Sequence, residues 1–171
     1  MKVASLEAIF DALETAGVRY LVVGGIAVTV HGHIRATMDL DLVVELAPEN
    51  AQRAVRALAG LGYRPQVPVR IEDFADPLRR REWSEQRNMQ VFSLVSDLHA
   101  QTTVDLFVTE PFDFEREYRR AERAKIAPNI HARVLSLPAL IAMKRAAGRA
   151  LDLEDARQLE LILEARGGAP S

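Results

Sequence analysis

The 171-residue sequence predicts an α+β protein, with a mixed β-sheet, helices packed on one face of it and a short C-terminal helical segment. Three observations lead to this prediction. Short apolar runs of strand length alternate with helical patterns through the first half of the chain. Two strand-like runs, 89–94 and 103–108, then follow each other without a helix between them. After residue 135 only helical patterns remain, so we divide the chain into a core at 1–135 and a helical segment at 136–171.

The first half of the chain predicts three helices and two strands. A helix capped by Ser5 and stopped by Gly17 is indicated by apolar residues at helical spacing. A buried strand at 20–23 is broken by two glycines, and a short helix then runs to about residue 32. A strand at 40–45 and a helix that begins at Pro48 and ends before Gly62 complete this half.

The second half predicts a different order. Segment 64–81 contains three prolines and is expected to be the least regular part of the chain. The remaining expected elements are strands at 89–94 and 103–108, a short helix within 112–123, an edge strand at 130–135 and helices at 139–148 and 152–166. We expect Asp152 to cap the last helix, whose apolar set is Leu153, Ala156, Leu159, Leu161 and Ile162.

Composition excludes several classes of function. The chain has no cysteine, which excludes disulfides, thiolate zinc sites and cysteine nucleophiles. Its net charge of -2 provides no general attraction for nucleic acid or an anionic membrane. Acidic residues interrupt the N-terminal region where a signal peptide would be apolar. The longest apolar run, 20–30, is shorter than the ~20 residues of a membrane span, so we expect a cytoplasmic protein with no membrane partner.

The pair Asp39 and Asp41 is the strongest chemical signal. Residues i and i+2 of a strand point to the same face, so both carboxylates project together while Leu40 and Leu42 enter the opposite face. Two neighbouring acids repel each other, and a divalent cation with oxygen ligands is a natural counter-charge. The alternative is a solvated pair of acids on an exposed strand.

Asp105 strengthens the metal interpretation. It lies within an otherwise apolar strand, where an acid costs free energy unless it is paired or bound to metal. If its strand lies beside that of Asp39 and Asp41, three carboxylates converge and can hold one or two metal ions. The alternatives are an edge-strand acid that faces water or an acid paired with arginine.

Gly24 and Gly25 end a buried strand and open a helix. At such a position backbone N–H groups can approach a phosphate closely. Turns need glycine in any case, so the pair gains meaning mainly because it precedes Asp39 and Asp41 by one short helix and a loop.

These motifs together resemble the DNA polymerase beta-like nucleotidyltransferase superfamily. The resemblance lies in the apolar run 22–28 around the two glycines, the segment 31–41 that ends in the acid pair, and the later single Asp105. Segment 140–149 followed by 151–155 is similar to the minimal and AbiEii/AbiGii toxin-like branch. The resemblance covers about residues 5–165 and implies the nucleotidyltransferase fold.

The resemblance also implies an activity, which is the transfer of an NMP from an NTP to an acceptor hydroxyl. It implies that Asp39, Asp41 and Asp105 are catalytic and hold Mg²⁺ or Mn²⁺. The nucleotide-binding residues that it implies are Gly24, Gly25, Arg35, Thr37 and Lys144. The acceptor is a tRNA or other RNA, a protein or a small molecule.

Two departures from the family pattern keep an alternative open. Gly25 replaces a serine common in active members, and Leu151 replaces the usual basic residue before Asp152. The alternative function is a non-catalytic nucleotide-binding component of a toxin–antitoxin pair, with a neighbour-encoded antitoxin or helical partner. A third reading is a phosphate-binding α/β protein of another class, in which Asp39 and Asp41 are a solvated pair.

A basic stretch around Arg79, Arg80 and Arg81 includes Trp83. It could follow an RNA backbone with the tryptophan as a stacking platform. Nearby acids offset its charge, so we favour a solvated loop whose tryptophan packs on the core.

Overall fold

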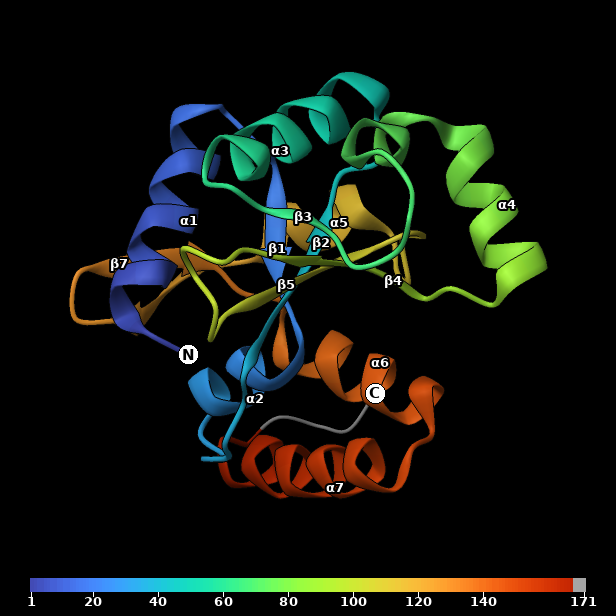
Figure 1. Cartoon of the computed structure of the whole chain (residues 1–171). Coiled ribbons are helices and arrows are strands. Elements are labelled where there is room, and N and C mark those ends of the chain that lie inside the picture. The colour runs from blue at the N-terminus through green and yellow to red at the C-terminus, as the bar shows by residue number, and fades with distance from the viewer. Residues whose placement is uncertain (168–171) are drawn as a thin grey trace.

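The computed structural model describes residues 1–167 (Figure 1). Its helices are α1 (Val3–Thr15), α2 (Gly24–His31), α3 (Pro48–Gly60), the 3₁₀ helix η1 (Ile71–Ala75), α4 (Pro77–Arg87), α5 (Phe114–Arg120), α6 (Leu137–Ala147) and α7 (Ala150–Ala165). Its strands are β1 (Tyr20–Val22), β2 (Asp39–Val44), β3 (Arg64–Pro65), β4 (Val91–Val95), β5 (Thr103–Phe107), β6 (Arg123–Ala127) and β7 (Ile130–Arg133).

The main sheet has five strands in the order β1-β2-β5-β4-β3. Only β2 and β5 run parallel; the other neighbours are antiparallel, so the sheet is mixed as predicted. β6 and β7 form a separate antiparallel hairpin. The parallel pair lies in the middle of the sheet, where two acid-bearing strands from distant parts of the sequence become neighbours.

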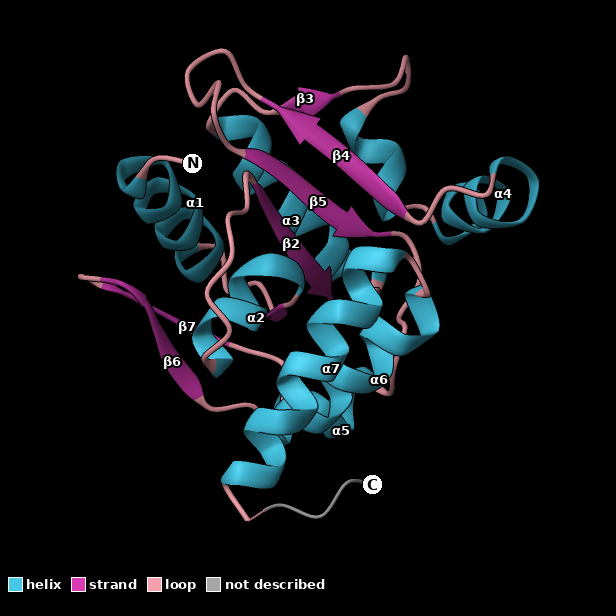
Figure 2. Cartoon of the chain, turned by 90° about the horizontal axis from the view of Figure 1, so that it is seen from below, coloured by secondary structure: helices cyan, strands magenta, loops and turns pink. Residues whose placement is uncertain are grey.

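Helices lie on both sides of this sheet. α3 lies above it in Figure 1, with α1 along the left-hand side, packed against α3, and α4 beyond the right-hand edge. The C-terminal helices α6 and α7 lie below the sheet together with α2. The view from below shows these three helices in front, while β4 and β5 remain largely uncovered (Figure 2). On β4 and β5 every second residue is partly exposed while the residues between are buried, so the face of these strands beside α2, α6 and α7 is partly open.

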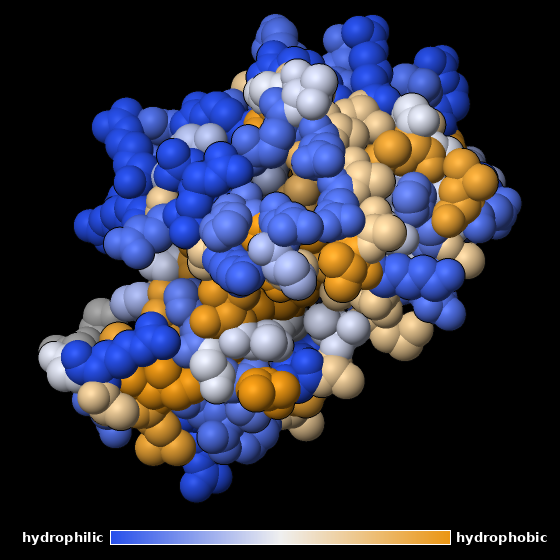
Figure 3. Space-filling view, turned by 90° about the vertical axis from the view of Figure 1, so that its left-hand side faces the viewer, coloured by the Kyte–Doolittle hydropathy of each residue, from blue (hydrophilic) through white to orange (hydrophobic). Residues whose placement is uncertain are grey.

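The alternation of side chains explains this arrangement. Leu40, Leu42, Val104 and Leu106 are fully buried in the core. The residues between them belong to the other face of the sheet, because side chains alternate along a strand. Seen from the side of α1 and β7, hydrophilic groups cover much of the surface and apolar groups are scattered among them (Figure 3). Within residues 1–167, no helix combines the length and apolarity needed to cross a membrane.

The largest difference from the sequence prediction concerns segment 64–81. It contains a short strand and η1, and its last residues begin α4, which Pro77 opens and Asp76 caps by accepting a hydrogen bond from the Leu78 N–H at 2.8 Å. Trp83 is only 1% exposed and stacks on Phe92 with ring centroids 5.1 Å apart. The stacking-platform interpretation of Trp83 is wrong, whereas its packing on the core is confirmed, from a helix rather than a loop.

Two predicted caps are also wrong. α1 begins two residues before Ser5, whose side chain is buried and contacts His99 Nδ1 at 3.0 Å. α7 begins two residues before Asp152, and the carboxylate of Asp152 faces lysine and arginine side chains instead of the helix N–H groups. In the same helix Leu153 and Leu161 are about half exposed, so only part of its expected apolar set is buried.

The β6–β7 hairpin extends the predicted edge strand. Segment 130–135 was expected to add a single strand, but β7 pairs with β6, which the charged sequence 123–127 did not suggest. A single parallel bridge between Val22 and Val134 connects the end of the hairpin to the main sheet.

Candidate active site

The three predicted carboxylates lie on two adjacent strands. In the parallel pairing of β2 with β5, Asp41 is opposite Asp105 and Asp39 is opposite Thr103. The three acids share the lower face of the sheet, since their strand neighbours Leu40, Leu42, Val104 and Leu106 are buried in the upper core. The expectation that the strand of Asp105 lies beside that of the acid pair is therefore confirmed.

The electrostatics of this cluster are those of crowded acids. Burial raises the pKa of Asp41 to about 6, and the charges of Asp105 and Asp39 add to the effect. Burial also raises the pKa of Asp105, with a smaller contribution from Asp39, while a hydrogen bond from Ser93 opposes the rise. Like charges held close together disfavour ionisation, so the site favours a bound cation or proton.

Gly24 lies against the Asp41 carboxylate. A Cβ atom at residue 24 would be 1.9 Å from Asp41 Oδ2, which is closer than any real contact, and the backbone φ of +61° also favours glycine. The chain can therefore start α2 directly beside the acid. The Gly25 N–H forms a hydrogen bond with Asp41 that opposes the rise in the pKa of this carboxyl.

Gly25 faces Thr37 and Arg35. Its missing Cβ atom would lie 2.7 Å from Thr37 Oγ1 and 3.1 Å from an Arg35 guanidinium nitrogen. The Thr37 hydroxyl donates a hydrogen bond of 3.2 Å to the Asp39 carbonyl oxygen. The loop between α2 and β2 thus folds over the start of α2, and four of the predicted site residues, Gly25, Arg35, Thr37 and Asp39, lie together there.

Lys144 of α6 is buried between α6 and α7. Its Nζ atom is 2.8 Å from Asp152 Oδ1 and 2.9 Å from Asp155 Oδ2. Arg35 Nη1 donates to the same Asp155 Oδ2 at 2.7 Å. The charge of Lys144 also lowers the pKa of Asp41, which places this ammonium within electrostatic range of the carboxylates.

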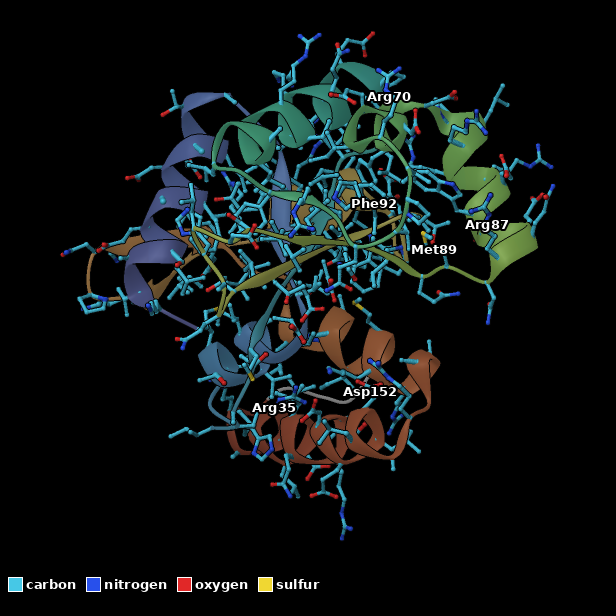
Figure 4. All side chains as sticks on the ribbon, in the orientation of Figure 1. Arg35, Arg70, Arg87, Met89, Phe92 and Asp152 are labelled. Atoms are coloured by element: carbon cyan, nitrogen blue, oxygen red, sulfur yellow. The ribbon has the colours of Figure 1, made fainter. Side chains whose placement is uncertain are left out.

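The basic stretch does not join this cluster. Arg70 lies at η1 and Arg87 on α4, whereas Arg35 and Asp152 lie in the layer below the sheet (Figure 4). Arg79 and Arg81 form surface ion pairs with Glu82 and Glu85. The charge of these arginines is thus offset within α4 itself.

Comparisons with known proteins bear on the fold. Neither a protein-family model nor a curated protein matches the sequence. Among solved structures, the crystal structure of a Thermotoga maritima protein described as a "putative nucleotidyltransferase" is similar, with a TM-score of 0.57 and 17% sequence identity. The match covers 91% of this chain and 90% of the other. This protein has a nucleotidyltransferase fold.

The chemistry of the three carboxylates suits a metal ion. Asp105 Oδ1 is buried and has no hydrogen-bond partner among the described residues, so it is an acceptor that a cation could satisfy. All three donors are carboxylate oxygens, which Mg²⁺ prefers. Within residues 1–167, no three acidic or histidine side chains lie close enough together to chelate a metal ion as they stand. The donor chemistry fits a divalent cation.

The nucleotidyltransferase fold brings three further residues to the site. Ser93 is opposite Asp105 in the antiparallel pairing of β4 with β5, a register that no sequence pattern disclosed. Asp155 contacts both Arg35 and Lys144. It follows Asp152 by three residues on one helix, and this spacing, which places both acids on one face, was visible in the sequence. Arg149 Nε is 2.5 Å from Asp152 Oδ2, and its pKa is raised by this bond first and also by the charge of Asp41.

Proposed function

We propose that this protein is a metal-dependent nucleotidyltransferase that transfers an NMP from an NTP to a hydroxyl of an RNA, protein or small-molecule acceptor. The observation that carries the proposal is the register that sets Asp105 beside Asp41, with Gly24 in contact with the Asp41 carboxylate. An acid cluster that directly adjoins a glycine turn at a helix N-terminus combines a cation site with a phosphate cradle.

Each predicted residue has a role in this proposal. Asp39, Asp41 and Asp105 would hold Mg²⁺ or Mn²⁺, which supplies charge neutralisation for the triphosphate when bound. Gly24, which has no Cβ atom between its backbone and the Asp41 carboxylate, and Gly25 at the start of α2 would cradle the phosphates. Arg35, Thr37 and Lys144 would add positive charge and a hydroxyl around the same phosphates.

The chemical step requires one proton acceptor. Asp105 is suited to this role if Asp39 and Asp41 alone hold the cation, because its Oδ1 atom has no partner among the described residues and burial raises its pKa. The acceptor hydroxyl would lose its proton to Asp105 as its oxygen bonds to the α-phosphorus. The bond from the α-phosphorus to the bridging oxygen would break, and pyrophosphate would leave.

Two measurements test the proposal. Isothermal titration with Mg²⁺ and each of the four NTPs should show binding to at least one of them. Incubation with α-labelled NTP and candidate acceptors should then yield labelled product that Asp39→Asn and Asp41→Asn abolish. Asp97→Asn is a matched control, because Asp97 is an exposed acid whose partner is Arg64 on the surface. Folded protein that binds no NTP above background would refute the proposal.

The finer assignment to the minimal or AbiEii/AbiGii toxin-like branch rests on the sequence motifs alone. Two positions favour the alternative function, a non-catalytic nucleotide-binding component of a toxin–antitoxin pair. Gly25 lacks a hydroxyl, and Leu151 presents an exposed apolar side chain where the branch has a basic one. Nucleotide binding without transfer, together with co-purification of a neighbour-encoded partner, would favour the alternative. Transfer that depends on Asp41 would exclude it.

A further inference from the structure

Asp155 is the centre of a buried ionic network below the sheet. It is fully buried, and its Oδ2 atom contacts cations from two different parts of the chain. Arg35 Nη1, from the loop between α2 and β2, is 2.7 Å away, and Lys144 Nζ, from α6, is 2.9 Å away. The second oxygen of Asp155 is 3.9 Å from His33 Nε2, which lies on the same loop as Arg35.

The network continues to the surface through Asp152, which contacts Lys144 and Arg149. Three cations thus share two carboxylates, and one positive charge remains in surplus. Lys144 and Arg149 each interact electrostatically with Asp41 as well. A buried charge without its partner is strongly unfavourable, so the network keeps its members in place.

Arg35, the partner of Asp155, also lies close to Gly25. A guanidinium nitrogen of Arg35 lies 3.1 Å from the position of a Cβ atom on Gly25, at the first turn of α2. The short loop that carries Arg35 also carries exposed Ile34 and Met38, so few apolar contacts fix its position. The ion pair with α7 is the strongest interaction that can hold the Arg35 side chain there.

We infer that Asp155 is a positioning residue, which acts through Arg35 to hold a positive charge over the glycine turn where the nucleotide triphosphate would bind. The inference rests on the proposed function for the identity of the ligand. It assigns to the C-terminal helices a part in the nucleotide site in addition to their packing. Asp155 itself does not touch the nucleotide in this arrangement.

The direction in which Asp155→Asn changes the affinity for NTP distinguishes a positioning role from a simple effect of charge. Asp155→Asn removes one negative charge near the triphosphate, so electrostatics alone predicts tighter NTP binding. Loss of positioning predicts weaker binding, by about tenfold or more for a charge-assisted hydrogen bond to phosphate. Glu164→Gln is the matched control, because it removes the same charge from an exposed position on the same helix. Unchanged or tighter binding by Asp155→Asn would overturn the inference.

A double-mutant cycle tests whether the effect passes through Arg35. Asp155→Asn in the background of Arg35→Gln should produce no further loss of affinity, since the positioned group is already absent. The double variant removes one positive and one negative charge, so the network keeps the net charge that it has in the wild type. It therefore remains informative if Asp155→Asn alone fails to fold. Full additivity of the two losses would show that Asp155 acts by another route.

A measurement without nucleotide distinguishes failure of this inference from failure of the proposed function. Hydrogen–deuterium exchange of the ligand-free protein should show faster exchange in peptides covering 32–38 for Asp155→Asn but not for Glu164→Gln. Exchange in β2 and β5 should stay unchanged, because a merely structural loss would affect the core as well. If the loop exchanges at the wild-type rate, Asp155 does not position it, whatever the wild-type protein binds.

Discussion

The Asp41 carboxylate occupies the space in which any residue other than glycine at position 24 would place its Cβ atom, with Oδ2 only 1.9 Å from that point. The contact is possible because Gly24 has no Cβ atom, and its left-handed φ of +61° is a second reason for glycine at this position. Gly24 of the glycine turn and Asp41 of the acid pair, which are 17 residues apart in the sequence, are therefore in direct contact.

Gly24→Ala should destabilise the protein by about 2–5 kcal/mol. Left-handed backbone strain contributes about 1–2 kcal/mol and overpacking against Asp41 about 1–3 kcal/mol. Gly60→Ala is the control, because nothing lies within 4 Å of its Cβ position in α3 and a small gain of about 0.5–1 kcal/mol is expected. Urea denaturation measures both, and equal stability of Gly24→Ala and wild type would contradict the contact.

Asp41→Asn should stabilise the fold at neutral pH while it removes activity. The pKa of Asp41 rises from 3.8 to about 6 on folding, so the folded state holds more protons between these values and stability falls as pH rises through them. At pH 7.5 the cost is about 3 kcal/mol, from 1.36 kcal/mol per pKa unit. The stability advantage of the variant should shrink as the pH approaches 4. Denaturation curves at pH 7.5 and pH 4.5 test this, and a constant advantage would refute it.

Mg²⁺ or Mn²⁺ should raise the melting temperature of the wild-type protein. A cation at 100 times its dissociation constant stabilises by about 2.7 kcal/mol, which corresponds to several degrees for a domain of this size. The increase should be smaller at pH 5 than at pH 7.5, because the carboxylates must lose protons to bind metal. EDTA should reverse it. An increase of the same size in Asp105→Asn would show that the cation binds elsewhere.

Gly25→Ser should destabilise the loop rather than restore a missing group. The Cβ atom of residue 25 would lie 2.7 Å from Thr37 Oγ1 and 2.8 Å from Thr37 Cβ, so threonine already occupies this space. We expect a loss of about 1–3 kcal/mol for the single change. Combination with Thr37→Gly should recover part of that loss, with a coupling of at least about 0.5 kcal/mol in the cycle. Additive losses would mean that the two side chains do not compete.

Trp83→Ala should cost about 3–5 kcal/mol, as expected for a fully buried aromatic residue. Trp83 is the sole tryptophan, so its fluorescence reports on its surroundings directly. NTP and single-stranded RNA should leave the emission unchanged, and acrylamide should quench it weakly. Strong quenching by RNA would return Trp83 to the role of a stacking platform.

The sequence predicted those parts of the site that depend on local pattern. The alternation around Asp41 identified its face correctly, and Gly24 marked the turn, because strand period and glycine backbone freedom are local properties. The neighbours of these residues depend on strand order. Nothing in the sequence near Ser93 indicates that it pairs opposite Asp105 across β4 and β5.

The charged residues of the C-terminal helices likewise have partners that the sequence alone does not reveal. Asp152 matches a helix cap in isolation, but a lysine from α6 and the neighbouring Arg149 compete for its carboxylate and prevail. Segment 77–87 was obscured because its proline was interpreted as a breaker, whereas proline at a first helical turn is favourable. Tertiary partners therefore decided the role of Asp152, whereas local helix chemistry decided segment 77–87.

The ionic network below the sheet also has a consequence for the order of synthesis. Asp39, Asp41 and Asp105 leave the ribosome before Lys144, Arg149 and Asp155 do. Until α6 and α7 have been made and docked, the nascent chain carries crowded acids without their nearby positive charges and an Arg35 without its anchor. A nascent chain that lacks these helices is therefore expected to bind nucleotide poorly, so that competence is acquired late in translation.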